Sequence, residues 1–407
     1  MPTPRILLAD ADAFYVSVAR LLDPEGAGRA DLLIVGGSAK HRGVVTSASY
    51  EARRYGVHSA MPMARAMRLC PNAMVVPVPW EACSDFAHRI RRVLERHAPV
   101  VETASSDEYY LDMTGTERLL KDEPFAETAR RIRLDVLAET RLSVSIGGGT
   151  SRLIAKLAAG VAKPGGVHVV DPGSEADFMR RFQLADIPMV GPKFQERLAR
   201  YNLKSVDDAL EAGSDRLRDW FGDREGVWLW DTIHGIGSSA VETGGDPKSI
   251  SRDETFSMDI DDDDALRHEL LGLIDRAAGD MREDGFLART ITVRIRDYDF
   301  TDRQTSRTMD APVISDRAIY RVACELLAKL REVRPAPARL LGVALGNLVR
   351  DEQPEQLSLL DVPAATTETE KDRAVARVVD ELRHKLGDEA VALGRVPERR
   401  RKYKPFG

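Results

Sequence analysis

The chain has 407 residues, of which 43% are hydrophobic and 30% are charged. At about 150 residues per domain this length predicts two to four domains, and the composition is that of a globular protein. No stretch approaches the roughly 18 uncharged apolar residues of a membrane span, and the N-terminal apolar run is too short for a signal peptide. We therefore expect a cytoplasmic protein. Three scattered cysteines exclude a disulfide framework and a cysteine-rich zinc site (Cys70, Cys83 and Cys324).

The formal net charge of −6 argues weakly against a nucleic-acid partner, because such proteins often carry a basic surplus. The distribution of charge matters more than its sum. Asp261 to Asp264 concentrate negative charge in one turn, and a cluster of five arginines follows between Arg289 and Arg307. An acidic protein can still hold a basic groove.

Apolar periodicity divides the first half of the chain into strands and helices. We predict strands at Arg5–Ala9, 32–35, 100–103, 109–113 and 142–146, and helices at 13–22, 60–70, 81–97 and 124–139. The order strand, helix, strand, strand, helix, strand is that of a split βαβ unit. This order appears only when residues 16–77 are treated as an insertion between the first strand and the helix at 81–97.

The second half changes character twice. Residues 177–236 are mostly helical, and Ser239–Pro247 is rich in glycine and threonine without periodicity, so it predicts a linker. Residues 248–350 follow the order strand, helix, strand, strand, helix, strand. In the strand near residue 290, polar residues alternate with apolar ones, which predicts a half-buried strand with a basic open face. A further helix is expected from about residue 369 to 386, with Gly387 as its stop.

Two acidic pairs terminate strands of the predicted sheet. Asp10 and Asp12 follow the first strand, and Asp107 and Glu108 stand at the corner before another. If the strands are neighbours, the carboxylates converge and repel one another unless a cation is present. Oxygen ligands without His or Cys favour Mg²⁺ or Mn²⁺, and two such ions about 3.5–4 Å apart serve phosphoryl and nucleotidyl transfer. The alternative is that each acid caps a turn or faces solvent.

A strand-to-helix turn carries groups suited to a polyphosphate. The segment RGVVTSASYEARRYGV places Ser47, Tyr50 and Arg53 together, and Lys163 in AKPGG could supply a further charge. Taken alone, Arg53 is more often a surface salt-bridge residue and Lys163 a solvated lysine. Their significance depends on the nearby acids.

Several blocks occur in a fixed order along the chain, namely DADAFYVSV, RGVVTSASYEARRYGVHSAMP with LCP, SSDEYYLDMTG, SVSIGGGTSRLIAKLAAGVAKPGG and KSISRDETF. With them the chain resembles the Y-family translesion DNA polymerases of the DNA polymerase IV type, from about residue 5 to 350. The resemblance implies a multidomain α/β (α+β) fold. Its expected parts are a ferredoxin-like palm (1–15 and 78–171), inserted fingers (16–77), a helical thumb (172–238), a linker (239–247), an α/β little finger that binds DNA (248–350) and a tail (351–407).

The same resemblance assigns roles residue by residue. Asp10, Asp107 and Glu108 match the catalytic metal ligands, with the backbone carbonyl of Ala11 beside them. Tyr15 matches the steric gate, a ring under the deoxyribose that excludes ribonucleotides; read alone, Phe14 and Tyr15 would be core aromatics. The remaining expected dNTP contacts are Phe14, Ser47, Tyr50, Arg53 and Lys163.

The chain departs from the family pattern at four positions. Ser106 stands where an aliphatic residue is usual, Tyr109 where a small one is usual, and Ala9 is smaller than the usual residue. In the thumb, IPMVGPK resembles a helix-hairpin-helix that grips a DNA phosphate through backbone N–H groups. Its first glycine is replaced by Met189, while the other expected contacts, Gly191 and Lys193, remain.

Two further binding segments are expected. Arg294 and Arg296 share one strand face in the little finger, and phosphate contacts from such a face give sequence-independent affinity. Arg289, Arg303 and Arg307 lie nearby in the sequence and join the expected DNA contacts; a solvated face is the alternative. In QLSLL, Gln356, Leu359 and Leu360 resemble the short peptide with which bacterial polymerases bind the sliding clamp, an extended segment that inserts apolar anchors into a groove.

The leading hypothesis is a template-directed DNA polymerase of low fidelity that carries out translesion synthesis by two-metal-ion transfer from a dNTP to a primer 3′-hydroxyl. Its expected cofactors are two Mg²⁺ ions, with Mn²⁺ as a substitute. Its expected partners are primer-template DNA, dNTPs and the sliding clamp, with no membrane, and we expect a monomer. A catalytically silent accessory protein is the alternative, and the presence of all three carboxylates disfavours it. A nucleotide cyclase would leave the fingers, thumb and little-finger blocks without a purpose.

Overall fold

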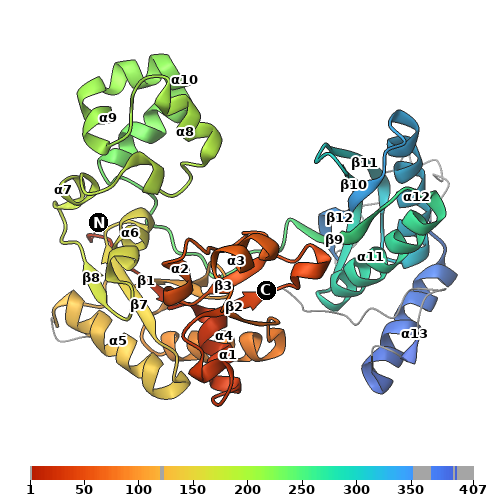
Figure 1. The fold of residues 1–407 in the computed structure, drawn as a ribbon, viewed down its shortest axis with the longest axis horizontal. Helices are drawn as coiled ribbons and strands as arrows, with labels where there is room; N and C mark the ends of the chain where they lie inside the picture. Colours follow the sequence, from red (N-terminus) through yellow and green to blue (C-terminus); the bar gives the residue numbers. More distant parts are fainter. Residues whose placement is uncertain (1, 120–122, 352–367, 388–389, 392–407) are drawn as a thin grey trace, which may run out of the picture.

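The computed structural model describes residues 2–119, 123–351, 368–387 and 390–391. Three sheets and the helices around them give a mixed α/β fold of several parts (Figure 1). No helix in these ranges is long and apolar enough to cross a membrane. The expected clamp-binding residues Gln356, Leu359 and Leu360 lie outside the described residues.

The N-terminal sheet has the strand order β5-β6-β1-β7-β8. β1 pairs antiparallel with both β6 and β7, which is the arrangement of a split βαβ unit, and β8 adds a parallel edge strand. The elements are β1 (Ile6–Ala11), α4 (Trp80–Leu94), β5 (Val100–Thr103), β6 (Glu108–Asp112), α5 (Phe125–Thr140), β7 (Val144–Gly149), α6 (Arg152–Ala162) and β8 (Val167–Val169).

The uninterrupted apolar run of β1 follows from burial on both faces of this sheet. Leu7 and Ala9 pack into the core formed with α4 and α5, and Ile6 and Leu8 pack against α6. The glycine run of β7 has a steric reason, because a Cβ on Gly147 would lie 2.1 Å from the Ala155 carbonyl oxygen of α6. The close approach of α6 brings its side chains over the end of β1.

A small sheet with the order β3-β2-β4 is inserted between β1 and α4. Its buried core includes Ile34 and Met63, and α1 packs beside it (Figure 1). The elements are α1 (Phe14–Leu22), η1 (Ala27–Arg29), β2 (Leu33–Gly36), η2 (Ala39–His41), β3 (Val45–Ala48), α2 (Tyr50–Arg53), α3 (Met63–Leu69) and β4 (Met74–Val76).

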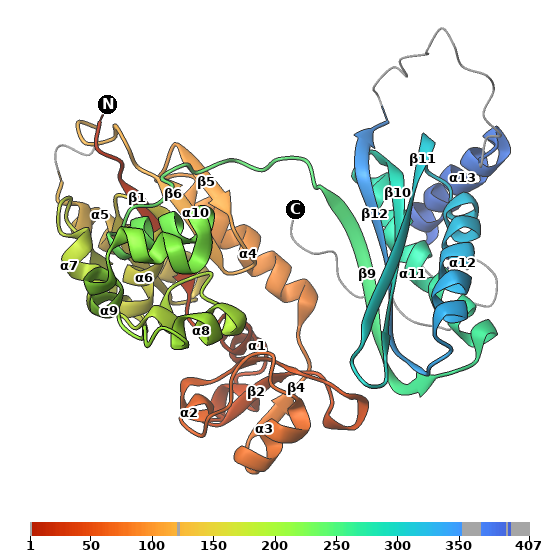
Figure 2. The same cartoon turned by 90° about the horizontal axis from the view of Figure 1, so that it is seen from above.

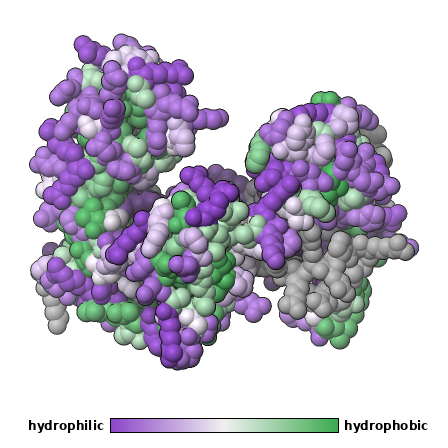
Figure 3. All heavy atoms as spheres, in the orientation of Figure 1, coloured by the Kyte–Doolittle hydropathy of each residue, from purple (hydrophilic) through white to green (hydrophobic). Residues whose placement is uncertain are grey.

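A helical segment follows β8 and has a core of its own, which includes Phe178, Leu198 and Phe221. Its longest helix is kinked at Gly222, where φ is 83°. The elements are α7 (Glu175–Met179), η3 (Leu184–Asp186), α8 (Pro192–Ala199), α9 (Val206–Ala212) and α10 (Ser214–Ile233). The space-filling view shows the surface hollowed between this segment and the C-terminal sheet (Figure 3).

The C-terminal sheet is antiparallel with the order β11-β10-β12-β9. Helices cover one of its faces, and the N-terminal sheet and the helical segment α7–α10 lie on the side of the other face (Figure 2). The apolar residues of β10 point to the helices, as the alternation predicts. The elements are β9 (Ser249–Ile260), α11 (Asp263–Glu283), β10 (Phe286–Asp297), β11 (Asp302–Val313), α12 (Asp316–Val333) and β12 (Ala338–Arg350).

The last helix, α13 (Glu370–Leu386), docks on the helical side of this sheet through ion pairs. Arg282 of α11 is 5% exposed and binds both Asp316 and Asp380, and Arg383 binds Asp275 at 2.7 Å. Because buried charges are costly unless paired, this network fixes α13 against α11. The predicted helix therefore packs against the C-terminal sheet unit.

Candidate active site

The acidic corner is built by the pairing of β1 with β6. Asp10 lies directly opposite Glu108 in the register, so their side chains share one face of the sheet. Just past the last register pair, the Ala11 N–H donates to the Asp107 carbonyl oxygen at 2.9 Å. The pairing therefore brings the backbone of Asp10, Asp107 and Glu108 to one corner from segments almost a hundred residues apart.

Asp10 is the most buried of these three carboxylates, with 12% of its side chain exposed. Burial raises its pKa to about 6 despite an ion pair with the Lys163 ammonium at 2.7 Å, and the charges of Glu108 and Asp107 add to the rise. Burial and the neighbouring carboxylates oppose the charged form of Asp10, and the Lys163 ammonium favours it.

The other two carboxylates also have partners. Glu108 accepts from Lys156 at 2.7 and 2.9 Å, and Asp107 accepts from the Ser105 hydroxyl at 2.7 Å. In the described part of the chain, no three His, Cys, Asp or Glu side chains are close enough to hold a metal ion together. The ammonium groups of Lys156 and Lys163 supply positive charge beside Glu108 and Asp10.

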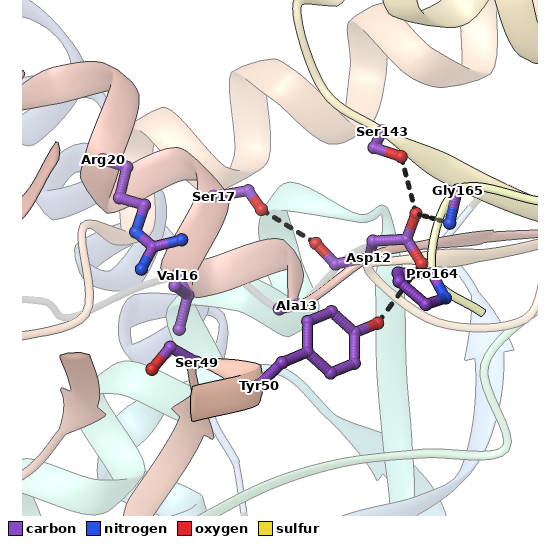
Figure 4. A pocket seen from close by; sticks show the side chains of 10 residues that line it. All are labelled: Asp12, Ala13, Val16, Ser17, Arg20, Ser49, Tyr50, Ser143, Pro164 and Gly165. Atoms are coloured by element: carbon purple, nitrogen blue, oxygen red, sulfur yellow. Dashed lines mark hydrogen bonds between the residues drawn. The ribbon is translucent and has the colours of Figure 1, made fainter. Parts of the chain in front are cut away.

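Asp12 does not join this corner. Asp12 is 5% exposed, and its carboxylate accepts hydrogen bonds from the Ser143 hydroxyl at 2.7 Å and from the Gly165 N–H at 2.9 Å (Figure 4). The Ser145 hydroxyl also donates to it at 2.7 Å. The Tyr50 hydroxyl donates to it at 3.4 Å. Asp12 therefore links the inserted small sheet to the loop that follows Lys163, and it borders a cavity of about 300 Å³.

The expected phosphate contacts lie on β3 and α2. Ser47 is buried, and Arg53 is exposed, donates from Nε to the Ala48 carbonyl at 2.9 Å and stacks over the Tyr50 ring at 5.0 Å. Burial and the nearby Asp12 charge raise the Tyr50 pKa to about 12, so the phenol stays a hydrogen-bond donor at neutral pH. The hydrogen bond from Tyr50 to Asp12 connects α2 to the loop that follows Lys163, because Gly165 of that loop also binds Asp12.

Tyr15 and Phe14 begin α1 beside the acidic corner. Tyr15 is half-buried, and its hydroxyl lies 3.0 Å from the Ser106 hydroxyl. Phe14 is 1% exposed and packs edge-on against Tyr15. The Phe14 ring therefore supports Tyr15, and the dNTP contact expected of Phe14 stays a prediction.

The arginines expected to contact DNA do not share one face of the C-terminal sheet. Arg294 and Arg296 lie on the open face, where they pair with Asp253 and Asp302. Arg303 and Arg307 are opposite Ile295 and Ile291, so they point to the helices, where they bind Asp297 and Glu325. Their intramolecular partners therefore differ from those of Arg294 and Arg296, and the DNA contacts expected of them stay a prediction. Arg289 lies at an irregularity in the register and donates to the Asp310 carbonyl at 2.9 Å.

The hairpin of the helical segment keeps its expected backbone despite the missing glycine. Met189 has a φ of 73°, in the left-handed region that glycine adopts readily, and its side chain is exposed. Gly191 is the N-cap of α8, and Lys193 is exposed on its first turn. The backbone shape can be adopted, at a cost in strain.

The sequence did not single out Lys156, Trp80 or the binding role of Asp12. Lys156 lies on α6 and pairs with Glu108, and the sequence gives no signal of that contact because Glu108 is far away in the chain. Trp80 packs edge-on against Tyr15 at 5.9 Å, and its position in the sequence gives no signal of this contact.

The fold and this corner define the class of the protein. A split βαβ sheet that presents three carboxylates at its two central strands, beside a phenol, a guanidinium and a lysine, is the apparatus of a nucleotidyltransferase.

Residues 9–160 match the impB/mucB/samB family, and residues 247–359 match the C-terminal domain of that family. A DNA polymerase IV from Staphylococcus epidermidis is 33% identical over 352 residues, which are 86% of this chain and 97% of the relative. A DNA polymerase IV from Staphylococcus saprophyticus is 34% identical over 348 residues, 86% of this chain and 96% of the relative.

Solved structures agree with these relatives. A Y-family DNA polymerase chimera, Dbh-Dpo4(243-245)-Dbh, has a TM-score of 0.76 at 26% identity over 85% of this chain and 99% of its own. An insertion ternary complex of Dbh DNA polymerase has a TM-score of 0.59 at 26% identity and the same coverage. The chain belongs to the impB/mucB/samB family and is a Y-family translesion DNA polymerase of the DNA polymerase IV type.

Proposed function

We propose that this DNA-directed DNA polymerase transfers a nucleotide from a dNTP to a primer 3′-hydroxyl at the corner of Asp10, Asp107 and Glu108, with two Mg²⁺ ions. One observation carries the proposal. Asp10 is buried opposite Glu108, and its pKa is raised to about 6 even with Lys163 in contact. Burial and the two neighbouring carboxylates oppose the charged form of Asp10, so a bound cation would stabilise that form further.

The residues present fit a divalent cation. The donors are carboxylate oxygens and the Ala11 carbonyl, which suit Mg²⁺ or Mn²⁺. When bound, such ions lower the pKa of an attacking hydroxyl and neutralise the charge of the leaving pyrophosphate. Asp10 and Asp107 would hold both ions, and Glu108 the ion nearest the primer hydroxyl.

The nucleotide itself is held by this chain's own donors. Tyr50 and Arg53 lie on α2 and Ser47 on β3, and Lys163, which pairs with Asp10, would join them at the triphosphate. A guanidinium and an ammonium orient a triphosphate by charge-assisted hydrogen bonds. Tyr15 would lie under the sugar and exclude a 2′-hydroxyl by contact.

Primer extension tests the assignment. Asp107→Ala and Glu108→Ala should each abolish nucleotide addition, because losing a metal ligand removes transition-state stabilisation, while DNA binding is largely retained. Asp112→Asn, at the far end of β6, is the matched control and should extend primers normally. Extension at near wild-type rate by either corner variant would refute the site.

We infer low fidelity from the family resemblance, and the alternative of a silent accessory protein predicts no extension at all. Extension of primers opposite undamaged and lesion-bearing templates separates the two. A protein that binds primer-template DNA without extending it, under conditions that support a related polymerase, would favour the accessory role.

For the DNA path, we propose that the palm, fingers, thumb and little finger occupy the ranges given by the sequence. Arg294 and Arg296, Gly191 and Lys193 would contact phosphates. The open face of the C-terminal sheet is turned toward the palm and thumb, which supports this path (Figure 2). Arg303 and Arg307 point to the helices and not to this open face.

We also propose that Gln356, Leu359 and Leu360 bind the sliding clamp. The chain is anchored on both sides of this segment, since the Asp351 N–H donates to Gly285 and Glu368 accepts from the Ile314 and Ser315 N–H groups. Replacing the three residues with alanine should weaken clamp binding at least tenfold, because truncated anchors typically cost about 2 kcal/mol or more. Clamp-free extension should be unchanged; equal clamp affinity would refute the assignment. We expect a cytoplasmic monomer.

A further inference from the structure

The Tyr15 ring is held from three sides. Phe14 packs edge-on against it at 5.3 Å and Trp80 at 5.9 Å. The third contact is polar and reaches across the chain, because the Tyr15 hydroxyl lies 3.0 Å from the hydroxyl of Ser106, ninety-one residues later. The Tyr15 ring is therefore held by a hydrogen bond at its hydroxyl end as well as by aromatic packing.

The contact between Tyr15 and Ser106 continues to the acidic corner. Either hydroxyl can donate in the bond between them, and the Ser106 hydroxyl also donates to the Asp107 carboxylate at 3.4 Å. The three residues form a relay that ends on a carboxylate of the acidic corner.

Tyr109 fixes the other end of Ser106. Its ring is 1% exposed, and its hydroxyl lies 3.1 Å from the Ser106 carbonyl and 3.1 Å from the Ala87 carbonyl of α4. Ser106 and Tyr109 are two of the positions at which this chain departs from the family pattern. The Tyr109 hydroxyl binds the Ser106 carbonyl and the Ser106 hydroxyl binds the Tyr15 hydroxyl, so the two departures position the Tyr15 ring together.

We propose that Ser106 is a specificity-determining residue that positions Tyr15 and thereby sharpens the rejection of ribonucleotides. The proposal rests on the proposed role of Tyr15 as the gate under the sugar. Rotation about the bond that carries an aromatic ring has a broad energy well, so an untethered ring can pivot away from a 2′-hydroxyl. A hydrogen bond at the ring tip restricts that pivot.

The test is the ratio of kcat/KM for dNTP to kcat/KM for rNTP, measured by single-nucleotide insertion with the full chain. One neutral hydrogen bond corresponds to roughly three- to tenfold in an equilibrium. Ser106→Ala should lower the ratio by about that factor. Tyr15→Phe keeps the ring and removes the same bond, so it should lower the ratio equally.

The double variant Tyr15→Phe/Ser106→Ala should be no worse than either single change, because one bond is lost in all three. Ser106→Thr keeps a hydroxyl and should restore the ratio. Ser105→Ala is the matched control, since Ser105 binds Asp107 but not Tyr15; it should change both nucleotides alike. Because each ratio compares two substrates on one protein, a general loss of folding leaves it unchanged.

Two results overturn the proposal in distinguishable ways. If Tyr15→Ala admits ribonucleotides but Ser106→Ala leaves the ratio unchanged, or if the two single effects add, the gate stands and the tether is refuted. If Tyr15→Ala itself leaves the ratio unchanged, the gate role fails and the tether fails with it.

Discussion

The Lys163 ammonium lies 2.7 Å from the Asp10 carboxylate, so a residue expected to bind the triphosphate is paired with one expected to bind metal. Asp10 ends β1, and Lys163 follows α6, whose close packing on β7 brings the lysine over the corner. Each charge neutralises the other when neither ligand is bound. Nucleotide and metal would have to displace this pair together, which couples their binding.

Asp10→Asn should stabilise the metal-free protein at neutral pH. The Asp10 pKa is raised from 3.8 to about 6, so the folded state binds the proton more tightly than the unfolded state. Stability from this group is present below pH 4 and is lost as pH rises through about 6. A shift of this size corresponds to at most about 3 kcal/mol, and we expect about 1–3 kcal/mol for the variant at pH 7.

The measurement is urea unfolding in EDTA at several pH values. The advantage of Asp10→Asn should vanish near pH 4, and added Mg²⁺ should stabilise only the parent, because a ligand stabilises the state that binds it. A pH-independent difference between the two proteins would contradict this origin of the effect.

Arg53→Ala should raise the KM for dNTP and lower kcat, because a guanidinium contact with phosphate serves both the ground state and the transition state. Arg53 is exposed, and in the part of the chain that the structure describes its side chain donates to the Ala48 carbonyl and stacks over Tyr50, so stability should change by less than about 1 kcal/mol. Steady-state insertion kinetics and a thermal melt check the two parts. The neighbour Arg54 is also exposed, and Arg54→Ala is the control.

Arg294→Ala and Arg303→Ala should have opposite effects. Arg294 forms an exposed pair, so its loss should change stability by less than about 1 kcal/mol, but it should weaken DNA binding and reduce the salt slope by about one. Arg303 binds Asp297, which is fully buried, so its loss should cost about 1–3 kcal/mol of stability and leave the salt slope unchanged. DNA titrations at several salt concentrations and urea melts separate the two; a reduced salt slope for Arg303→Ala would restore it to the DNA face.

Met189→Gly should stabilise the thumb hairpin. A non-glycine residue in the left-handed region costs roughly 1–2 kcal/mol, and the exposed Met189 side chain has little packing to lose. The greater freedom of glycine in the unfolded chain offsets part of this gain, so we expect a net gain of about 0.5–1 kcal/mol. Met189→Ala keeps the strain and is the control. A lower melting temperature for the glycine variant than for the alanine variant would contradict the expectation.

The sequence predicted the strands of the N-terminal sheet and the acids at their ends. The β1 segment is a continuous apolar run that ends in acids, and the helices that cover the sheet have clear periodicity, so local pattern determines both. The corner was predictable because antiparallel pairing of two short strands brings their ends together. The final helix was predictable for the same local reason, from its periodicity and from Gly387.

Only the tertiary structure decided which side chains face each other. β11 is an edge strand with polar residues on both faces, so no apolar pattern marks the side that carries Arg303 and Arg307. The Tyr15–Ser106 bond and the Asp12 hydrogen bonds join residues that are far apart in the chain. Periodicity reports whether a face is buried, but the partner on that face is fixed by strand register and helix packing, which depend on the whole chain.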